Sequence, residues 1–212
     1  MEFFRDVTVA LRGPTGIPQT ASDTISKLSD RLSPATLLAD RRAAVLSLKG
    51  LSRDCRQEVG DRSLLGLLEV LSNDAELDAD IGKAVLETLY ILCEAEDGTP
   101  AAKELGFKYT DCVLANEKAT YTMLSLLGDT NFYIRLATLQ YLTVLLQNRR
   151  QVVQGYFLTS PSGATNVISV LEDKRNIIRN GECCFYSIWW SGTAGPVRTH
   201  SFARIGTTSS PI

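Results

Sequence analysis

The sequence has little of what catalytic and metal sites are usually built from. Histidine occurs once, at His200, so a zinc site, a Ser-His-Asp triad or a Cys-His pair would depend on that one side chain. The sequence contains neither a Gly-x4-Gly-Lys-Ser/Thr loop nor a Gly-x-Gly-x-x-Gly motif, so it gives no indication of nucleotide binding. We therefore expect no catalytic residue, no cofactor and no metal, and favour a binding module over an enzyme.

Disulfide and glycosylation signals are also missing. The five cysteines are an odd number without a Cys-x-x-Cys pair: Cys55, Cys93, Cys112, Cys183 and Cys184. They lie mostly in apolar helical stretches, where a free cysteine behaves as a small buried hydrophobe. No Asn-x-Ser/Thr acceptor occurs. These features predict a protein of a reducing compartment.

Long hydrophobic runs are absent. No stretch approaches the roughly 18 apolar residues that a membrane-spanning helix needs. The first residues already carry charge at Glu2, Arg5 and Asp6, which argues against a signal peptide. We expect a protein that is soluble or peripherally bound to membranes.

The acidic run from Asp74 to Asp80 resembles the start of a calcium loop but does not fit one. The glycine required at the sixth position is Ala79, and the glutamate required at the twelfth is Val85. The spacing instead favours a negatively charged first helical turn, stabilised by the helix dipole.

The total charge of the chain is nearly balanced, but acidic and basic residues are unevenly distributed along the sequence. The net charge is −2, which gives no global indication of nucleic-acid binding. Residues 61–130 carry 14 acidic and 5 basic side chains, whereas residues 131–212 carry 3 and 8. This pattern is compatible with an acidic stripe that faces basic partners and with ordinary solvated helix faces.

One pattern occurs three times in the sequence: a leucine-rich helix, then a polar turn, then a longer apolar helix. The three leucine-rich helices are predicted at residues 63–71, 121–127 and 166–171. The interval from Leu71 to Leu127 is 56 positions and that from Leu127 to Leu171 is 44; an acidic segment at 94–100 is expected to account for the excess. Periods of about 40–47 residues are typical of armadillo and HEAT solenoids. Since alternation of period two is nearly absent, we predict an all-α solenoid of about three to four repeats.

Helix starts and apolar ladders can be placed within these repeats. A first helix is predicted to start at Thr20 or Ser22, and the next at Ser33–Pro34, with Ser33 as N-cap and Pro34 at the first helical position. Two long helices carry apolar ladders at helical spacing: Ile81, Val85, Leu89 and Leu92, then Ile134, Thr138, Leu142 and Leu145. Ladders of this width are expected to be buried on two sides by neighbouring helices.

The composition divides the chain into a flexible lead-in at 1–20, helical repeats at 21–190 and a disordered tail at 191–212. Ile178 lies 44 positions after Ile134 and continues the repeat, but the tail contains mainly Ser, Gly, Thr and Pro. The last helix would present several apolar side chains to no following repeat: Phe185, Tyr186, Ile188, Trp189 and Trp190. Exposed patches of this kind predict self-association.

Candidate partner contacts are few and consist of paired residues. The cation pairs Arg41-Arg42 and Arg149-Arg150 lie near helix ends and are suited to acidic segments of a partner. Exposed charges that flank helices are the alternative interpretation. Trp189 and Trp190 add an aromatic pair at the end of the last repeat.

One stretch resembles a specific family. The run LADRRAAVLSLKGLS at 38–52, continued by RQEVG at 56–60, resembles the start of the globular head of the general vesicular transport factor family, the golgin-type tethers of endoplasmic-reticulum-to-Golgi traffic. Shorter pieces agree in order and spacing over about residues 21–180: TISKLSDR at 24–31, VLETLY at 85–90, SPSG at 160–163, VLED at 170–173 and IRN at 178–180.

The resemblance implies a cytoplasmic protein, peripheral to Golgi and transport-vesicle membranes. It implies an armadillo-like head that continues beyond this chain, followed by a coiled coil, and partners among Rab-type GTPases, SNAREs and Golgi matrix proteins. After Asn180 the sequence leaves the family pattern, which favours a truncated or misread gene product with a shifted frame or a retained intron.

Two rival functions remain beside the tether. An armadillo-type adaptor or scaffold that binds extended peptides would line its groove with repeated Trp and Asn one turn apart. Here both tryptophans are adjacent, at Trp189 and Trp190. An enzyme is the third possibility, and the missing site chemistry argues against it.

Overall fold

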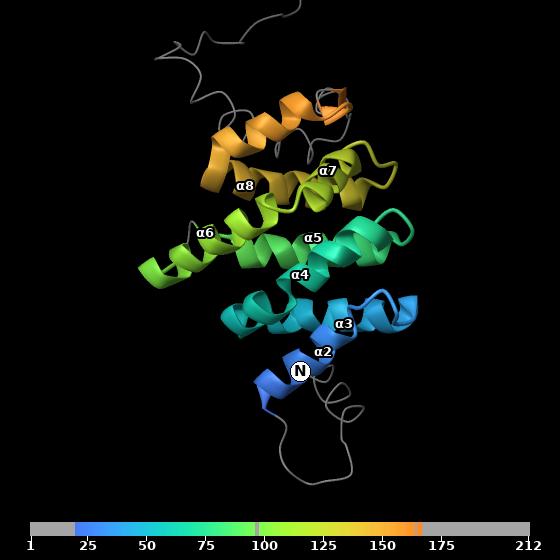
Figure 1. Ribbon diagram of the computed structural model, residues 1–212, viewed down its shortest axis with the longest axis vertical. Coiled ribbons are helices and arrows are strands. Elements are labelled where there is room, and N and C mark those ends of the chain that lie inside the picture. Colours follow the sequence, from blue (N-terminus) through green and yellow to red (C-terminus); the bar gives the residue numbers. More distant parts are fainter. Residues whose placement is uncertain (1–19, 96–97, 164, 167–212) are drawn as a thin grey trace, which may run out of the picture.

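Every secondary-structure element in the described part of the chain is an α-helix. The structure, a computed structural model, describes residues 20–95, 98–163, 165 and 166 (Figure 1). Its helices are α2 (Ala21–Asp30), α3 (Leu38–Leu51), α4 (Arg56–Asp74), α5 (Ala79–Cys93), α6 (Pro100–Leu114), α7 (Glu117–Leu126) and α8 (Phe132–Thr159). The all-α prediction is confirmed. The predicted tail at 191–212 and the lead-in before residue 20 lie outside the described residues.

Side-chain caps fix where most of these helices begin. The Thr20 hydroxyl accepts a hydrogen bond from the Asp23 amide (3.1 Å), and the Thr20 amide donates to the Asp23 carboxylate (3.4 Å). This reciprocal pair is a capping box, and it starts α2 where the sequence predicts it. Four later helices also have a side chain that accepts from a first-turn amide: Asp78 for α5, Thr99 for α6, Asn116 for α7 and Asn131 for α8.

The start of α3 differs from its prediction. Ser33 is not the N-cap and Pro34 is not the first helical residue; they belong to a turn in which the Thr36 amide donates to the Ser33 carbonyl (2.9 Å), and α3 begins after Leu37. The Arg41 guanidinium donates to the carbonyl oxygens of Pro34 and Thr36 and holds this turn in place. A side chain of the following helix thus outweighs the local preference for a Ser-Pro helix start.

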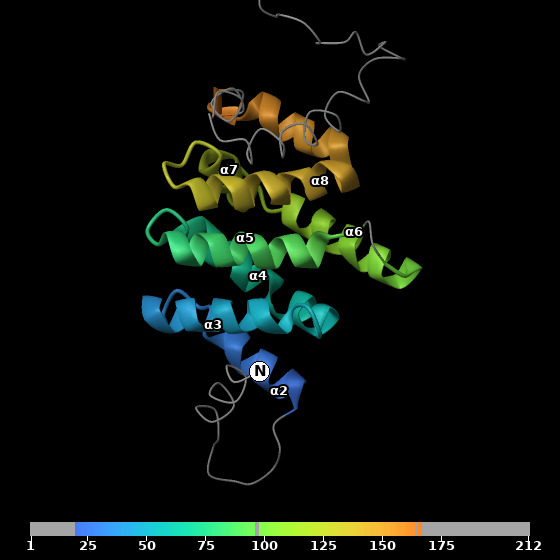
Figure 2. The same cartoon turned by 180° about the vertical axis from the view of Figure 1, so that it is seen from behind.

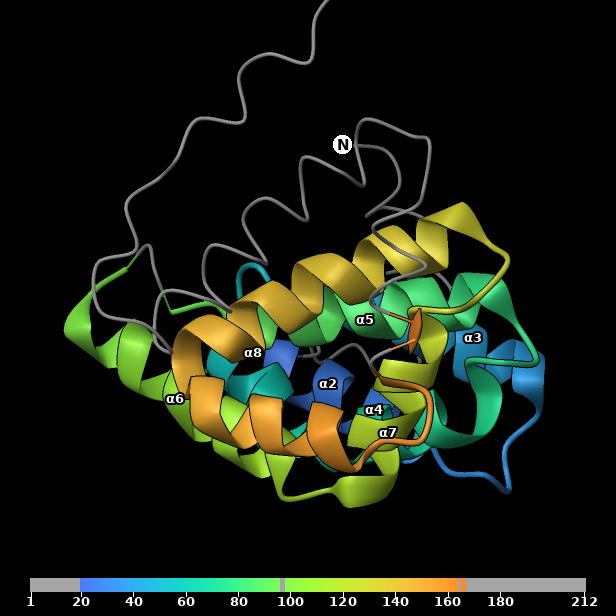
Figure 3. The same ribbon diagram turned by 90° about the horizontal axis from the view of Figure 1, so that it is seen from above.

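Apart from α6, the described helices stack in two rows along one axis, and each layer of the stack takes one helix from each row: α2 with α3, α4 with α5, and α7 with α8. α3, α5 and α8 lie one above another on one face of the molecule (Figure 2), and we call them the long-helix row. α2, α4 and α7 form the second row behind it, as the view along the stack shows (Figure 3). Each member of a row packs against the next, which is the arrangement of a helical solenoid. The predicted armadillo-like architecture is confirmed.

The two predicted ladders form the centre of the core. All eight side chains are at most 1% exposed: Ile81, Val85, Leu89, Leu92, Ile134, Thr138, Leu142 and Leu145. α5 packs against α3 on one side and α8 on the other, so its ladder is covered from two sides. The Thr138 hydroxyl donates to the Ile134 carbonyl (2.8 Å), which satisfies the polar atom inside this apolar stripe.

The long first interval between repeats contains a complete helix. α6 has Thr99 as its N-cap and Pro100 at its first position, a sequence signal for a helix start. Gly106 lets α6 approach the end of α5 closely, because a Cβ there would lie 2.6 Å from the Glu94 carbonyl oxygen. The acidic segment at 94–100 therefore accounts for only part of the extra length, and α6 supplies the rest.

The last described helix passes from one repeat into the next. α8 is bent at Arg149, whose torsion angles are non-helical (φ −143°, ψ 58°). Residues 150–159 beyond this kink lie above the first part of α8 (Figure 1) and begin a fourth unit. Three layers and the start of another agree with the predicted three to four repeats. The rest of that unit, with Ile178, lies outside the described residues.

Candidate partner-binding surface

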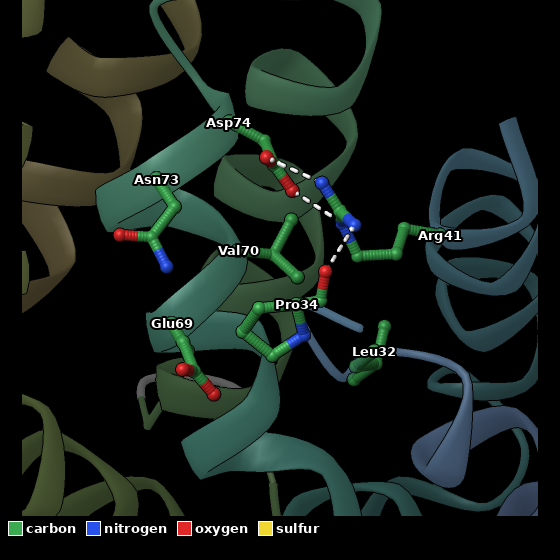
Figure 4. A pocket seen from close by; sticks show the side chains of 7 residues that line it. All are labelled: Leu32, Pro34, Arg41, Glu69, Val70, Asn73 and Asp74. Carbon is green, nitrogen blue, oxygen red and sulfur yellow. Dashed lines mark hydrogen bonds and ion pairs between the residues drawn. The ribbon is translucent and has the colours of Figure 1, made fainter. Parts of the chain in front are cut away.

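A buried ion pair joins the start of α3 to the end of α4. Arg41 Nε donates to Asp74 Oδ2 (2.7 Å) and Arg41 Nη2 donates to Asp74 Oδ1 (2.8 Å), so the pair is bidentate (Figure 4). The two side chains are only 12% and 5% exposed. Donation of these hydrogen bonds to the Asp74 carboxylate raises the pKa of Arg41 above its ordinary value. Since an unpaired charge would be costly at this depth, the pair fixes how the first two layers meet.

The pair borders a shallow hollow of about 210 Å³ between α4 and the turn before α3 (Figure 4). The lining residues are Leu32, Pro34, Arg41, Glu69, Val70, Asn73 and Asp74. Arg41 and Asp74 are bonded to each other, and the Asn73 side-chain oxygen accepts from Lys118 Nζ (2.8 Å). Because its polar groups largely satisfy one another, we assign no ligand to this hollow.

Arg42 makes a second and more exposed link between layers. Arg42 Nη2 donates to Asp78 Oδ1 (3.0 Å) and to Asp80 Oδ2 (2.6 Å). Asp78 also caps α5, accepting from the amides of Asp80 (3.0 Å) and Ile81 (3.2 Å). The prediction of a charged helix start is confirmed for Asp78 and Asp80, whereas Asp74 ends α4 and Glu76 lies in the turn between the two helices. Arg42 is 41% exposed and therefore remains accessible.

The charge contacts continue from α3 across α5 to α8. Lys49 Nζ pairs with the Glu87 carboxylate, and Lys83 Nζ lies 3.8 Å from Glu87 Oε1. Lys83 Nζ also lies 5.0 Å from the centre of the Tyr133 ring, a cation–π contact between α5 and α8. These contacts tie all three members of the long-helix row together.

Arg149 stabilises the kink in α8. Its Nε and Nη2 atoms donate to the two carboxylate oxygens of Asp111 in α6 (2.6 and 2.8 Å), and its guanidinium lies 4.9 Å from the centre of the Phe107 ring. Donation of these hydrogen bonds to the Asp111 carboxylate raises the pKa of Arg149 above its ordinary value. Arg150 follows as a half-buried side chain, and Trp189 and Trp190 lie outside the described residues. Their predicted partner contacts stay predictions.

The last carbonyl groups of α5 are bound by one side chain from α4, in the same layer, and one from α8, in the next layer. Arg56, at the start of α4, donates to Leu92 O (2.7 Å) and to Glu94 O. Asn148 Nδ2, in α8, donates to Cys93 O (2.8 Å) and to Thr110 Oγ1 (2.8 Å). The final carbonyls of a helix have no partner within the helix. Arg56 and Asn148 provide those partners and close this end of the row, which we call the end edge.

A buried thiol lies directly beneath the end edge. Cys93 Sγ is 3.9 Å from Tyr141 Oη, and both side chains are fully buried. Burial raises the pKa of Cys93 to about 12 and also raises the pKa of Tyr141 well above its ordinary value. Both groups are therefore neutral near pH 7, so Cys93 is an inert packing residue and not a nucleophile.

The opposite end of the row, where its helices begin, is more open. We call residues 37–42, 76–83 and 129–135 the start edge; in Figures 1 and 2 these segments lie stacked along one side of the molecule. Four large apolar side chains there reach solvent: Leu37 (74% exposed), Leu38 (39%), Leu77 (77%) and Tyr133 (59%). They come from three successive layers and recur at the same place, the beginning of a long helix.

Several residues that hold these surfaces are missing from the sequence-based predictions. Lys49, Arg56 and Asn148 act on residues 36 to 55 positions away in the chain. No local spacing marks such partners, because they depend on how one layer sits on the next. Leu37 had a local signal, since leucine is a poor N-cap.

Comparison with known proteins identifies homologues of this chain. Human general vesicular transport factor p115 (Homo sapiens) is 36% identical to the chain over 188 residues, which cover 85% of the chain and 19% of p115. The chain is a homologue of the general vesicular transport factor family. Intracellular protein transport protein uso1 of Schizosaccharomyces pombe is 31% identical over 185 residues, covering 87% of the chain and 17% of that protein. The chain thus spans about a fifth of the length of these p115 and uso1 relatives.

The fold agrees with the same relationship. The crystal structure of Uso1-2 matches with a TM-score of 0.72 and 27% identity, covering 84% of this chain and 30% of that one. No protein-family model matches the chain. None of the described helices has the length and apolar character needed to cross a membrane. No group of three or more His, Cys, Asp or Glu side chains within the described ranges is placed to hold a metal ion.

Proposed function

We propose that this chain is a protein-binding part of a vesicle-tethering head that acts in endoplasmic-reticulum-to-Golgi and intra-Golgi transport. The observation that carries the proposal is the 36% identity to human p115 over 85% of the chain. The resemblance of residues 38–52 and 56–60 to the start of that family's head supports the same assignment.

The layered stack is physically suited to binding and not to chemistry. Solenoids present long, rigid surfaces that grow with each repeat, so partners attach over several layers at once. The buried polar groups of the described core, such as Arg41 with Asp74, are bonded to one another and hold layers together. The proposed partners are Rab-type GTPases, SNAREs and Golgi matrix proteins, met at the cytoplasmic side of Golgi and vesicle membranes.

Among the cations predicted to meet partners, the structure favours Arg42 and Arg149 as the accessible ones. Their side chains are 41% and 36% exposed, against 12% for Arg41. Arg42 shares the carboxylates of Asp78 and Asp80 and can exchange one of them for a carboxylate of a partner at little cost. Arg149 binds the single carboxylate of Asp111, and a partner carboxylate would join that exposed pair. We propose that Arg42 and Arg149 contribute such contacts, while Arg41 acts within the fold.

The proposal is tested by immobilising the full chain and passing cell lysate over it in buffers with a GTP analogue or with GDP. Bound proteins are identified by mass spectrometry. Enrichment of secretory-pathway Rab GTPases in the GTP-analogue sample, or of SNAREs in both, is the expected result. Recovery of import receptors or nuclear cargo would instead favour a peptide-binding adaptor, and recovery of neither group would contradict the proposal.

A further inference from the structure

The start edge carries an apolar group and a carboxylate without an ion pair in each of three layers of the described chain, and we propose that it binds a basic amphipathic helix of a partner protein. This inference does not depend on the transport role, because it uses only the chemistry of the edge. Its three layers contribute Leu37 with Asp40, Leu77 with Glu76, and Tyr133 with Asp129.

The apolar groups are concentrated at this edge. Of eight large apolar side chains exposed in the described residues, four lie there. Two others, Val152 and Leu158, follow the kink in α8, and Leu46 and Leu65 are single residues in the middle of α3 and α4. Single exposed leucines are ordinary on a protein surface, whereas a row that recurs from layer to layer indicates an interface.

Leu37 is placed against its own local preference. It is the N-cap of α3, and its side chain makes no capping hydrogen bond. Leucine is among the poorest N-cap residues, whereas five of the other described helices have a Thr, Asp or Asn cap. At 74% exposure Leu37 gains no burial in return. A residue that breaks a local rule without a structural gain is a candidate for a binding role.

The charges left over at this edge are of one sign. Arg42 and Lys83 are engaged with Asp78, Asp80, Glu87 and the Tyr133 ring. The other two cations of the edge are also engaged, Arg41 with Asp74 and Arg135 with the Asp129 carbonyl oxygen (2.8 Å). Asp40 and Glu76 make no ion pair in the described part of the chain, and the Asp129 carboxylate accepts only from the Asn131 amide (2.6 Å). The edge therefore offers unpaired carboxylates beside its apolar groups, which complements Lys or Arg next to apolar side chains in a partner.

The spacing of the layers selects a helix as the occupant. Packed helices lie about 8–10 Å apart, so three layers place their apolar groups about 20 Å from first to last. An α-helix rises about 10.5 Å in seven residues, so apolar side chains seven residues apart meet successive layers. A helix of about 14 residues spans the whole edge. The expected partner segment thus has large apolar side chains every seven residues, flanked by Lys or Arg.

Binding is tested by fluorescence anisotropy with the full chain and a labelled helical peptide of about 21 residues that carries Leu every seventh position and Lys beside each Leu. One control peptide has the same composition with the Leu positions scrambled, and another has Glu in place of Lys. The patterned basic peptide is expected to bind at least about tenfold more tightly than either control, and to weaken as salt rises.

The matching variant removes the apolar row as Leu37→Ser/Leu77→Ser/Tyr133→Ser. It is expected to lower affinity for the patterned peptide about tenfold or more. Leu37→Ser alone is the safeguard against a folding artefact, because a Ser N-cap is expected to keep or raise Tm while affinity still falls. Leu65→Ser, equally exposed but on α4, is the control and is expected to leave affinity unchanged.

The carboxylates are tested separately. Asp40→Asn/Glu76→Gln is expected to reduce the affinity for the patterned peptide and the salt dependence of that affinity, and Glu104→Gln in α6 is the matched control.

Two results would overturn the proposal. The first is equal binding of the patterned and scrambled peptides, or unchanged affinity in the Leu37→Ser and triple variants. The second is a chain that is dimeric by light scattering and becomes monomeric in the triple variant, which would assign the edge to a second copy of this chain.

Discussion

The two edges of the long-helix row are joined by different chemistry. At the start edge, adjacent layers are linked by pairs of charged side chains, as in Arg41 with Asp74 and Arg42 with Asp78. At the end edge, side chains bind backbone carbonyls, as Arg56 and Asn148 do at the end of α5. No large apolar side chain is exposed at the described ends of α3 and α5, whereas three are exposed where these two helices begin: Leu37, Leu38 and Leu77.

This difference separates a closed edge from an open one. A carbonyl bound by a side chain has a fixed position and leaves no apolar surface, so the end edge works as a seam within the fold. Charged side chains on the surface can be shared with a partner, and exposed leucines gain by being covered. The same row of helices thus has one edge suited to holding the stack together and one suited to binding.

The largest effect is expected at the buried part of the start edge. Arg41→Ala leaves the Asp74 carboxylate, 5% exposed, without its partner. We expect the free energy of unfolding, measured by urea denaturation, to fall by about 3–5 kcal/mol. Arg31→Ala, an exposed cation at the end of α2, is the control and should change stability by less than about 0.5 kcal/mol. A loss below about 1 kcal/mol for Arg41→Ala would mean that the Arg41–Asp74 pair does not fix how the first two layers meet.

A smaller loss is expected from the end edge. Arg56→Ala removes the bonds to Leu92 O and Glu94 O from the last turn of α5. Hydrogen bonds that involve a charged group contribute about 1.5–3 kcal/mol, and we expect a destabilisation in that range by urea denaturation. Arg53→Ala, exposed in the same turn, is the matched control. Equal effects of the two substitutions would mean that water replaces Arg56 at these carbonyls.

The thiol beneath the end edge reports whether that edge stays closed. A pKa raised to about 12 keeps Cys93 protonated at pH 8, and the site excludes reagent as well. We expect iodoacetamide to label Cys93 only when the native state opens, more slowly than the half-buried Cys55 and Cys112. Asn148→Ala is expected to speed labelling of Cys93 severalfold and to destabilise by about 1 kcal/mol. Rapid labelling of Cys93 in the unsubstituted chain would show that the end edge opens readily.

The smallest effect is expected from the exposed link at the start edge. Arg42 is 41% exposed, so its bonds to Asp78 and Asp80 compete with water. Arg42→Ala should destabilise by less than about 1 kcal/mol in urea denaturation, and less again at high salt. A loss as large as that of Arg41→Ala would show that Arg42 is a structural residue and would argue against its proposed role in partner contacts.

The tertiary structure explains why glycine occupies position 60, which the sequence alone does not. Gly60 ends the RQEVG run that marks the family resemblance, yet nothing local requires glycine at this place in α4. In the structure the Tyr109 ring of α6 lies directly over it, so a Cβ at Gly60 would overlap that ring. Tyr109 Oη then donates to Gln57 O (3.1 Å) and contacts Asp61 Oδ1 (3.2 Å). The requirement for glycine comes from a residue 49 positions further along.

The sequence by itself determined the helices and their repetition. Apolar ladders such as the one from Ile81 to Leu92, and a cap such as Thr20, act over one or a few turns, so their signal is contained in consecutive residues. Only the tertiary structure decided that Arg41 meets Asp74, that Asn148 binds the end of α5 and that α3 begins after an exposed Leu37. These depend on the register between stacked layers, which is set by packing across 33 to 55 positions of chain and not by any local pattern.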